Sequence, residues 1–339
     1  MARVLVTGGC GFIGSHVAEQ LVGRGQRVTV LDDLSGGFTD NLVDGIDFVH
    51  GSITDRQLVE QTFERGRFEY VYHLAAYAAE GLSPFIKRFN YNNNLVGSVT
   101  LINAAINYNV KCFVFTSSIA VYGTGPDLPL LENGPVHPDD SYGIAKLGVE
   151  YELRICKELF DLDYIVFRPH NVYGERQNIG DKYRNVVGIF MNQIMQNQPM
   201  TVFGDGEQVR AFSYVGDVAP LLAEAIDVRE AYNQVFNIGA DEPYSVNRLA
   251  AAVAYAMGER PRIDYLPARH EALNAYSSHE KLRRAFGNRS VRSLEEGLER
   301  MARWAKQHGA RHSQVFEDIE VTKNFPLGWM PATCAIPSA

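Results

Sequence analysis

A tyrosine and a lysine stand four residues apart in the segment DDSYGIAKLG, residues 139–148. Four residues make about one helical turn, so Tyr142 and Lys146 lie on one face if the segment is a helix. The plain interpretation is an ordinary pair on a surface helix. The alternative is a phenol that a neighbouring ammonium makes more acidic, so that it can serve as a base. Only the rest of the chain can decide between these two.

Three glycines follow the first apolar run of the chain. In VTGGCGFIGSH (6–16), Gly8, Gly11 and Gly14 recur every third position and lead into a helical pattern. Glycines at such a turn let the backbone approach a pyrophosphate, and the helix N-terminus adds N–H donors. Asp32 ends the next apolar run, 18 residues after Gly14, which is close to the spacing of an acid that binds an adenosine ribose. The pattern predicts a dinucleotide site.

The same acid favours one of two cofactors. A carboxylate at Asp32 accepts hydrogen bonds from ribose hydroxyls but repels a 2′-phosphate, and no Lys or Arg lies between Val28 and Asp55. The expected cofactor is therefore NAD and not NADP. Asp33 is either an adenine-side contact or a solvated loop acid.

Elements that could position these groups alternate along the first half of the chain. Short apolar runs, typical of strands covered on both faces, lie at 3–7, 27–31, 47–50, 70–75, 112–117 and 164–168. Helical patterns fall between them, at 12–24, 55–65, about 84–108 and 143–160. This alternation predicts an α/β fold with a doubly wound parallel (Rossmann) sheet.

The regular alternation of strand and helix patterns ends at about residue 170. Residues 200–215 read as strand, turn, strand, VFNIG (235–239) reads as another sheet strand, and the C-terminal region reads as helical to about 309. We therefore expect a second, smaller substrate-binding lobe interleaved with the first. The expected division is 1–169 and about 212–240 for the dinucleotide-binding domain, about 170–211 and 241–325 for the smaller lobe, and 326–339 for a poorly ordered tail.

Composition narrows the classes of partner. The 339 residues are 46% hydrophobic, enough for a large core, and the net charge is -8, which disfavours nucleic acid and anionic membranes as partners. No apolar run approaches the roughly 20 residues of a membrane span, and no signal-peptide pattern is present. The four cysteines lack metal-ligand spacing, so we expect no metal site and a reduced, cytoplasmic protein.

Several short motifs together resemble a known family. TGGCGFIGSH (7–16), HLAA (73–76), TSSIAVYG (116–123), YGIAK (142–146) and FRPHNVYG (167–174) are similar in order and spacing to the extended short-chain dehydrogenase/reductase family, over roughly residues 3–310. Within the family, the chain most resembles sugar-nucleotide epimerases of the UDP-glucose 4-epimerase type.

The resemblance implies catalytic roles. Tyr142 would be the base on the sugar hydroxyl, Lys146 would bind the nicotinamide ribose and lower the tyrosine pKa, and Ser118 would bridge the hydroxyl and the phenol. Taken alone, Ser118 could equally cap a strand end. In a 4-epimerase, NAD takes the hydride from C4, the 4-keto sugar turns, and the hydride returns to its other face.

Other reactions of the family need additional acids. The 4,6-dehydratases carry an Asp-Glu pair directly after the serine, where this chain has Ile119 and Ala120, and the UDP-glucuronate decarboxylases typically carry Glu at the second position. Neither apolar side chain can transfer a proton. A non-catalytic NAD-binding sensor is a further alternative, but it would have little use for the three catalytic residues together.

The resemblance also assigns the remaining binding residues. For the cofactor these are Gly8, Gly11, Phe12, Ile13, Gly14, Asp32, Asp33, Ser52, Ile53, Leu74, Ala75, Ala76, Tyr142 and Lys146. For the sugar nucleotide they are Ser118, Tyr142, Asn171, Asn185, Val186, Phe203, Arg210, Arg269 and Glu271, although Arg210 could instead form a surface salt bridge. The chain departs from the family at Ser52, His170 and Ala211.

The sequence leaves alternatives for the identity of the sugar and for the oligomeric state. The default substrate pair is UDP-glucose and UDP-galactose. The alternative is UDP-glucuronate, because Arg176, Lys182 and Arg184 could pair with a C6 carboxylate unless they belong to a solvated loop. Residues 89–106 and the Tyr142 helix usually form a dimer interface in the family, so we expect a homodimer, although these could be ordinary helix faces of a monomer.

Overall fold

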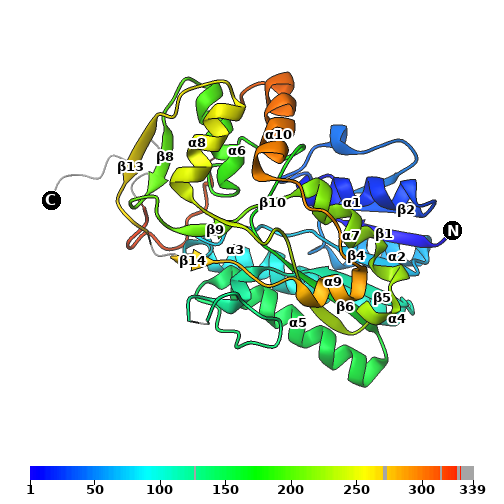
Figure 1. Cartoon of the computed structure of the whole chain (residues 1–339). Helices are drawn as coiled ribbons and strands as arrows, with labels where there is room; N and C mark the ends of the chain where they lie inside the picture. The colour runs from blue at the N-terminus through cyan, green and yellow to red at the C-terminus, as the bar shows by residue number, and fades with distance from the viewer. Residues whose placement is uncertain (126, 270–272, 314, 327–328, 330–339) are drawn as a thin grey trace.

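A seven-stranded parallel sheet forms the centre of the molecule, seen in a computed structural model that describes residues 1–125, 127–269, 273–313, 315–326 and 329 (Figure 1). The strand order is β11-β6-β5-β4-β1-β2-β3, and every neighbouring pair is parallel. The strands are β1 (Arg3–Thr7), β2 (Arg27–Asp32), β3 (Asp47–His50), β4 (Tyr70–His73), β5 (Cys112–Thr116), β6 (Asp163–Pro169) and β11 (Gln234–Ile238). The predicted doubly wound sheet is confirmed.

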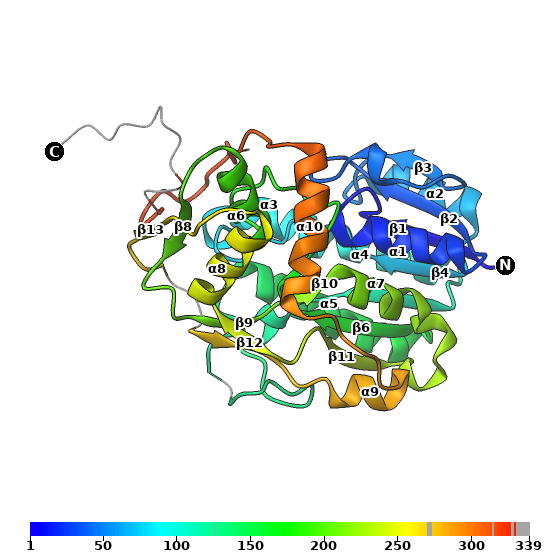
Figure 2. The ribbon, with the colours of Figure 1, turned by 45° about the horizontal axis from the view of Figure 1, so that its top comes forward.

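Side-chain alternation along the strands explains why helices cover both faces. Val4 and Val6 of β1 join one buried cluster with α1 and α7, whereas Leu5 between them joins a second cluster with α2, α4 and α5. Figure 2 shows α1 and α7 in front of the sheet. The helices are α1 (Phe12–Gly23), α2 (Arg56–Gly66), α4 (Gly97–Asn107), α5 (Ser141–Phe160) and α7 (Val215–Glu224).

The helix predicted at about 84–108 is present but not uniform. A 3₁₀ turn (Ser83–Phe85) leads into α3 (Lys87–Tyr91), a π-helical turn (Asn92–Val96) and then α4. The π turn carries the buried Asn94, whose carboxamide accepts a hydrogen bond from the Tyr77 N–H at 2.8 Å and donates one to the Tyr77 carbonyl at 3.0 Å. This helix therefore fixes the loop that follows β4.

Three small sheets lie beside the central one. The strands expected within 200–215 are β8 (Met200–Phe203), β9 (Val209–Ala211) and β10 (Ser213–Tyr214). They do not pair with one another, because β8 pairs with β13 (Ile263–Leu266), β9 with β12 (Pro243–Ser245) and β14 (Asn274–Ala275), and β10 with β7 (Val172–Tyr173). The expectation of an all-helical C-terminal region was therefore wrong for β12, β13 and β14.

Helices α6 (Val186–Met195), α8 (Val246–Ala256) and α10 (Leu294–His308) gather near the small sheets, and α9 (Glu280–Phe286) lies against β11 (Figure 2). The remaining 3₁₀ turns are Thr39–Asn41, Ile119–Tyr122, Ala225–Asp227 and Arg229–Ala231. Among the described residues, none of the helices has the length and apolarity that a bilayer crossing requires.

Candidate active site

One cavity of about 630 Å³ opens where the strands of the central sheet end. Gly8, Asp32, Leu74, Thr116 and Pro169, which lie at or just beyond the carboxyl ends of five strands, all line it. Ligands of doubly wound sheets bind at this edge. Every predicted site residue lines the cavity except Ser52, which the structure places outside the lining, and Glu271, which lies outside the described residues.

The glycine loop forms a cradle that larger residues would fill. Gly8 has φ +70°, and a Cβ there would lie 2.6 Å from the Ala75 nitrogen, while a Cβ on Gly14 would lie 2.0 Å from the Gly8 carbonyl oxygen. The following helix begins at Phe12, and no side chain caps its first N–H groups. The close backbone approach and the uncapped helix N-terminus fit a pyrophosphate.

Asp32 is held by the backbone around it. Its two oxygens accept hydrogen bonds from the N–H groups of Cys10 at 2.9 Å and Leu34 at 2.8 Å. The carboxylate is nearly buried, and burial raises its pKa. Asp33 is exposed, and Ser52 turns away because its hydroxyl pairs with Thr54 at 2.9 Å.

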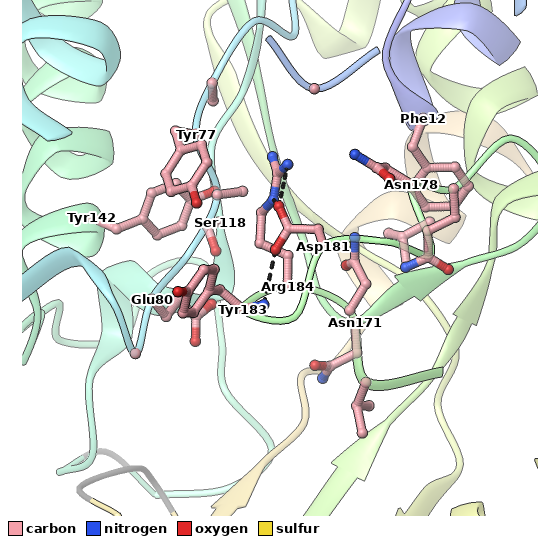
Figure 3. A pocket seen from close by; sticks show the side chains of 18 of the residues that line it. Phe12, Tyr77, Glu80, Ser118, Tyr142, Asn171, Asn178, Asp181, Tyr183 and Arg184 are labelled. Carbon is pink, nitrogen blue, oxygen red and sulfur yellow. Dashed lines mark hydrogen bonds and ion pairs between the residues drawn. The ribbon is translucent and has the colours of Figure 1, made fainter. Parts of the chain in front are cut away.

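Helix α5 brings the predicted catalytic residues together. Asp140 caps it by accepting a hydrogen bond from the Gly143 N–H at 2.9 Å, which places Tyr142 in the first turn and Lys146 in the next. Ser118, just after β5, lies beside Tyr142 (Figure 3), and its side chain acts to lower the pKa of the Tyr142 phenol. The Lys146 ammonium donates to the Thr116 carbonyl at 2.8 Å, 5.7 Å from the centre of the Tyr142 ring.

Burial dominates the electrostatics of this group. Tyr142 is 5% exposed, and burial raises its pKa above the usual value, with Glu80 and Asp140 acting in the same direction and Ser118 opposing them. Burial lowers the pKa of Lys146 to about 7. The protein alone therefore does not lower the tyrosine pKa, because burial outweighs the opposing effects of Ser118 and Arg184.

A buried network that the sequence did not reveal supports these residues. Arg168 forms two hydrogen bonds to Glu150 at 2.9 and 2.5 Å, and Ser117, next to Ser118, donates to the same carboxylate at 2.5 Å. The Arg168 guanidinium also lies 4.7 Å from the centre of the Tyr122 ring. The network joins α5 to the ends of β5 and β6.

The other end of the cavity holds the predicted sugar-nucleotide residues. Asn171 donates to the Ala211 carbonyl at 3.2 Å, and Arg210 donates to the Leu273 carbonyl at 3.0 Å. The Arg269 guanidinium lies 4.7 Å from the centre of the Phe203 ring. Asn185, Val186, Phe203 and Arg269 all line the cavity.

The three cations considered for a uronate substrate do not lie in the same place. Arg176 pairs with Glu19 at 2.7 Å and does not line the cavity, whereas Lys182 and Arg184 do. Arg184 is 14% exposed and pairs with Asp181 at 2.5 Å, so a fully solvated loop was the wrong description for it. Figure 3 shows this pair between the Tyr142 side and the Phe12 side of the pocket.

Sequence reasoning missed several lining residues. They include Asn178, Asp181 and Tyr183, which lie in a loop with no regular pattern, and Trp329, which lies in the segment expected to be a poorly ordered tail. Trp329 is 3% exposed, and its ring lies 5.3 Å from that of Tyr183. Within the described residues, no cluster of three His, Cys, Asp or Glu side chains could hold a metal ion.

Comparisons with known proteins agree with this geometry. Residues 4–239 match the family described as the NAD dependent epimerase/dehydratase family. A putative UDP-glucose 4-epimerase of Methanocaldococcus jannaschii is 33% identical over 307 residues, covering 90% of this chain and 99% of that protein.

Solved structures are similar over the same extent. The UDP-glucose 4-epimerase of Thermotoga maritima with UDP-glucose is 35% identical, with a TM-score of 0.86 over 90% of this chain and 99% of the other. The Thermus thermophilus UDP-glucose 4-epimerase complex with NAD is 33% identical, with a TM-score of 0.83 over 89% of this chain and 98% of the other. The chain belongs to the NAD-dependent epimerase/dehydratase family.

Proposed function

We propose that the protein catalyses the 4-epimerisation of a UDP-sugar of the UDP-glucose/UDP-galactose type through a transient 4-keto intermediate. The observation that carries the proposal is the grouping of Ser118, Tyr142 and Lys146 beside the glycine cradle, with the apolar Ile119 and Ala120 at the positions where the dehydratases carry acids. Both apolar residues also line the cavity, and neither could remove water from a sugar.

The cofactor is NAD, which accepts and returns the hydride at C4 when it is bound. The protein's own groups handle the proton. Tyr142 takes the proton of the C4 hydroxyl and Ser118 orients that hydroxyl, while Lys146 binds the nicotinamide ribose. Asn171, Arg210 and Arg269 hold the diphosphate and ribose, and Asn185, Val186 and Phe203 enclose the nucleotide.

Isotope tracing tests the reaction. Substrate deuterated at C4 should give the epimer with deuterium still at C4, without solvent deuterium on carbon and without loss of water or CO₂. Solvent label at C5, or a 4-keto-6-deoxy product, would instead identify a dehydratase.

A neutral hexose fits the site better than a uronic acid. Arg184 is already paired with Asp181, and Lys182 donates to the Trp329 carbonyl at 3.1 Å. Glu80 lies close enough to Tyr142 to raise its pKa, so it would also repel a carboxylate on the sugar. UDP-glucuronate remains the second candidate because Lys182 and Arg184 still line the cavity.

Three matched variants separate these candidates. We expect wild type to have a higher kcat/KM for UDP-glucose than for UDP-glucuronate. Arg184→Ala and Lys182→Ala should leave that order unchanged, and Arg176→Ala is the control, because Arg176 faces Glu19 outside the cavity. A uronate preference that Arg184→Ala or Lys182→Ala abolishes, and Arg176→Ala does not, would replace our assignment.

We also propose that the enzyme is a homodimer. Helix α5 exposes Ile144, Tyr151, Ile155 and Leu159 along one side, and the adjoining helix exposes Val96. Leu159 is 68% exposed, and together these side chains form an apolar stripe, which is typical of a surface that another chain covers. A face of this kind would be buried in a helical interface between two copies.

Two further proposals concern organisation. We propose that 1–169 with about 212–240 acts as the NAD unit and the rest as the sugar-nucleotide unit. NAD and UDP should then each protect a different set of amides from hydrogen exchange, and identical patterns would contradict the division.

We also propose a reducing cytoplasmic location, since the described cysteines Cys10, Cys112 and Cys156 are free and buried. Cell fractionation tests this, and recovery outside the cytoplasm would refute it.

A further inference from the structure

The chain after α10 crosses back over the cavity instead of leaving the molecule. We call the described residues 309–313 and 315–326, together with Trp329, the C-terminal strap. On one side, the N–H groups of Glu320 and Val321 donate to the Phe85 carbonyl at 2.9 and 3.1 Å. The Glu320 carboxylate in turn accepts hydrogen bonds from the N–H groups of Arg88 and Phe89, at 2.8 and 2.9 Å. These bonds fix the strap to the start of α3.

The strap is also fixed to the loop that carries Lys182 and Tyr183. The Tyr183 hydroxyl accepts a hydrogen bond from the Phe316 N–H at 3.1 Å, and Lys182 donates to the Trp329 carbonyl at 3.1 Å. The Phe316 ring lies 4.9 Å from the ring of Phe89. The strap therefore bridges two segments of the cavity lining that belong to distant parts of the chain.

Trp329 is the point where the strap meets the nucleotide end of the cavity. Its ring lies 6.1 Å from that of Phe203, and the Arg269 guanidinium lies 4.7 Å from the Phe203 ring centre and 5.6 Å from that of Trp329. From the opposite side, a Cβ on Gly81 would lie 3.0 Å from the indole. Although Trp329 is 3% exposed, it lines the cavity.

We infer that Trp329 is a binding residue for the nucleoside diphosphate part of the substrate, supplied by a segment outside the matched family region. Two aromatic rings beside a guanidinium suit a planar base that carries a diphosphate, because the parts of the rings that line the cavity can contact the base and the cation can pair with phosphate. The family match ends at residue 239, and the 307 residues aligned with the Methanocaldococcus jannaschii relative are about the length of this chain up to the end of α10. The inference rests on the proposed function.

The chain offers a direct fluorescence test, because its only two tryptophans are Trp304 and Trp329. Trp304 lies on α10 beside His308, with ring centres 4.6 Å apart, and is not among the cavity-lining residues. Trp304→Phe leaves Trp329 as the sole reporter, and Trp329→Phe leaves Trp304. In the NAD-loaded enzyme, UDP should change the emission of Trp304→Phe saturably and leave that of Trp329→Phe unchanged. UDP binding seen by calorimetry, without any response of Trp329, would overturn the inference.

Affinity provides the second test. Stacking of a base on an aromatic side chain corresponds to about a 5- to 150-fold loss of affinity on alanine substitution. We expect Trp329→Ala to weaken UDP by this order and to raise KM, while NAD retention and kcat stay near wild type. Equal UDP affinity in Trp329→Ala and wild type would refute the role, and if this variant does not fold, the fluorescence test decides. A wild type that binds NAD but not UDP would contradict the proposed function itself.

Discussion

At the scale of single residues, the site combines a buried phenol with a buried amine whose pKa values move apart. Burial raises the pKa of Tyr142 and lowers that of Lys146 to about 7. In the protein alone, burial disfavours both the phenolate form of Tyr142 and the ammonium form of Lys146. The sequence predicted that Tyr142 and Lys146 lie one helical turn apart, as they do in α5. It could not predict these pKa shifts, because burial depends on the whole fold.

Tyr142→Phe removes only the proton acceptor, so it should fold and retain NAD. General base catalysis contributes about 10²–10⁴-fold, and we expect kcat to fall within or beyond this range. Tyr151→Phe is the matched control, because Tyr151 lies on the same helix but does not line the cavity. Epimerisation by Tyr142→Phe within tenfold of wild type would disprove the assigned role.

The oxidation state of NAD should control the ionisation of Tyr142. A positive charge within about 4–6 Å favours phenolate and lowers a tyrosine pKa by roughly 1–3 units. Phenolate absorbance, taken as wild type minus Tyr142→Phe, should therefore appear at lower pH with oxidised than with reduced cofactor. The same titration curve for both forms would show that the cofactor charge does not act on this phenol.

Lys146 should make the stability of the cofactor-free protein depend on pH. Its folded pKa of about 7 is below the unfolded value of about 10.4, so between these values the unfolded state binds more protons. The unfolding free energy of wild type relative to Lys146→Met should then rise with pH, by at most about 1.4 kcal/mol per unit, across this window. Denaturant titrations of both proteins at several pH values measure this difference. If the unfolding free energies of wild type and Lys146→Met changed with pH in parallel, the prediction would be wrong.

At the scale of elements, the sequence predicted the central sheet well and the small sheets poorly. The central strands are continuous apolar runs, so local pattern identifies them, whereas β13 and β14 are short and form because β8 and β9 offer unpaired edges. The π turn within 84–108 was likewise not predictable, since Asn94 is buried there by its bonds to Tyr77.

Asn94→Ala should measure what this turn contributes. The substitution leaves two backbone groups of Tyr77 without their partner, and we expect a loss of about 2–4 kcal/mol in the free energy of unfolding. Asn92→Ala, in the same turn but exposed, should cost far less. Urea unfolding compares the two variants, and equal losses would argue against the buried bonds as the cause.

At the scale of the whole molecule, side chains far apart in sequence meet in ways that no local pattern reveals. His170 and His279 share a hydrogen bond of 3.0 Å although 109 residues separate them. Trp329 reaches Phe203 and Tyr183 in the same way. The motifs pointed to the glycine loop and the α5 residues that line the cavity because these motifs are local, and the strap was missed because its partners lie far from it in the sequence.

The dimer proposal is tested by a charge in the exposed face of α5. Ile155→Glu would bury a carboxylate in an apolar interface, so we expect it to shift the mass in solution from dimer to monomer. Tyr255→Glu, on the exposed side of α8, is the control. Light scattering after size-exclusion chromatography gives the masses, and a monomeric wild type would reject the proposal.

The position of the C-terminal strap late in the chain has a consequence for how the enzyme is made. At about 5–20 residues per second, the 308 residues between Gly8 and Phe316 take the ribosome roughly 15–60 s to add. The cofactor cradle is therefore translated long before the strap, which adds Ser313 and Trp329 to the cavity lining, and we expect NAD to bind the newborn protein before the strap is in place. A chain stopped at His308 should accordingly exchange its bound NAD faster than the full chain, and equal exchange rates would show that the strap does not restrict this exchange.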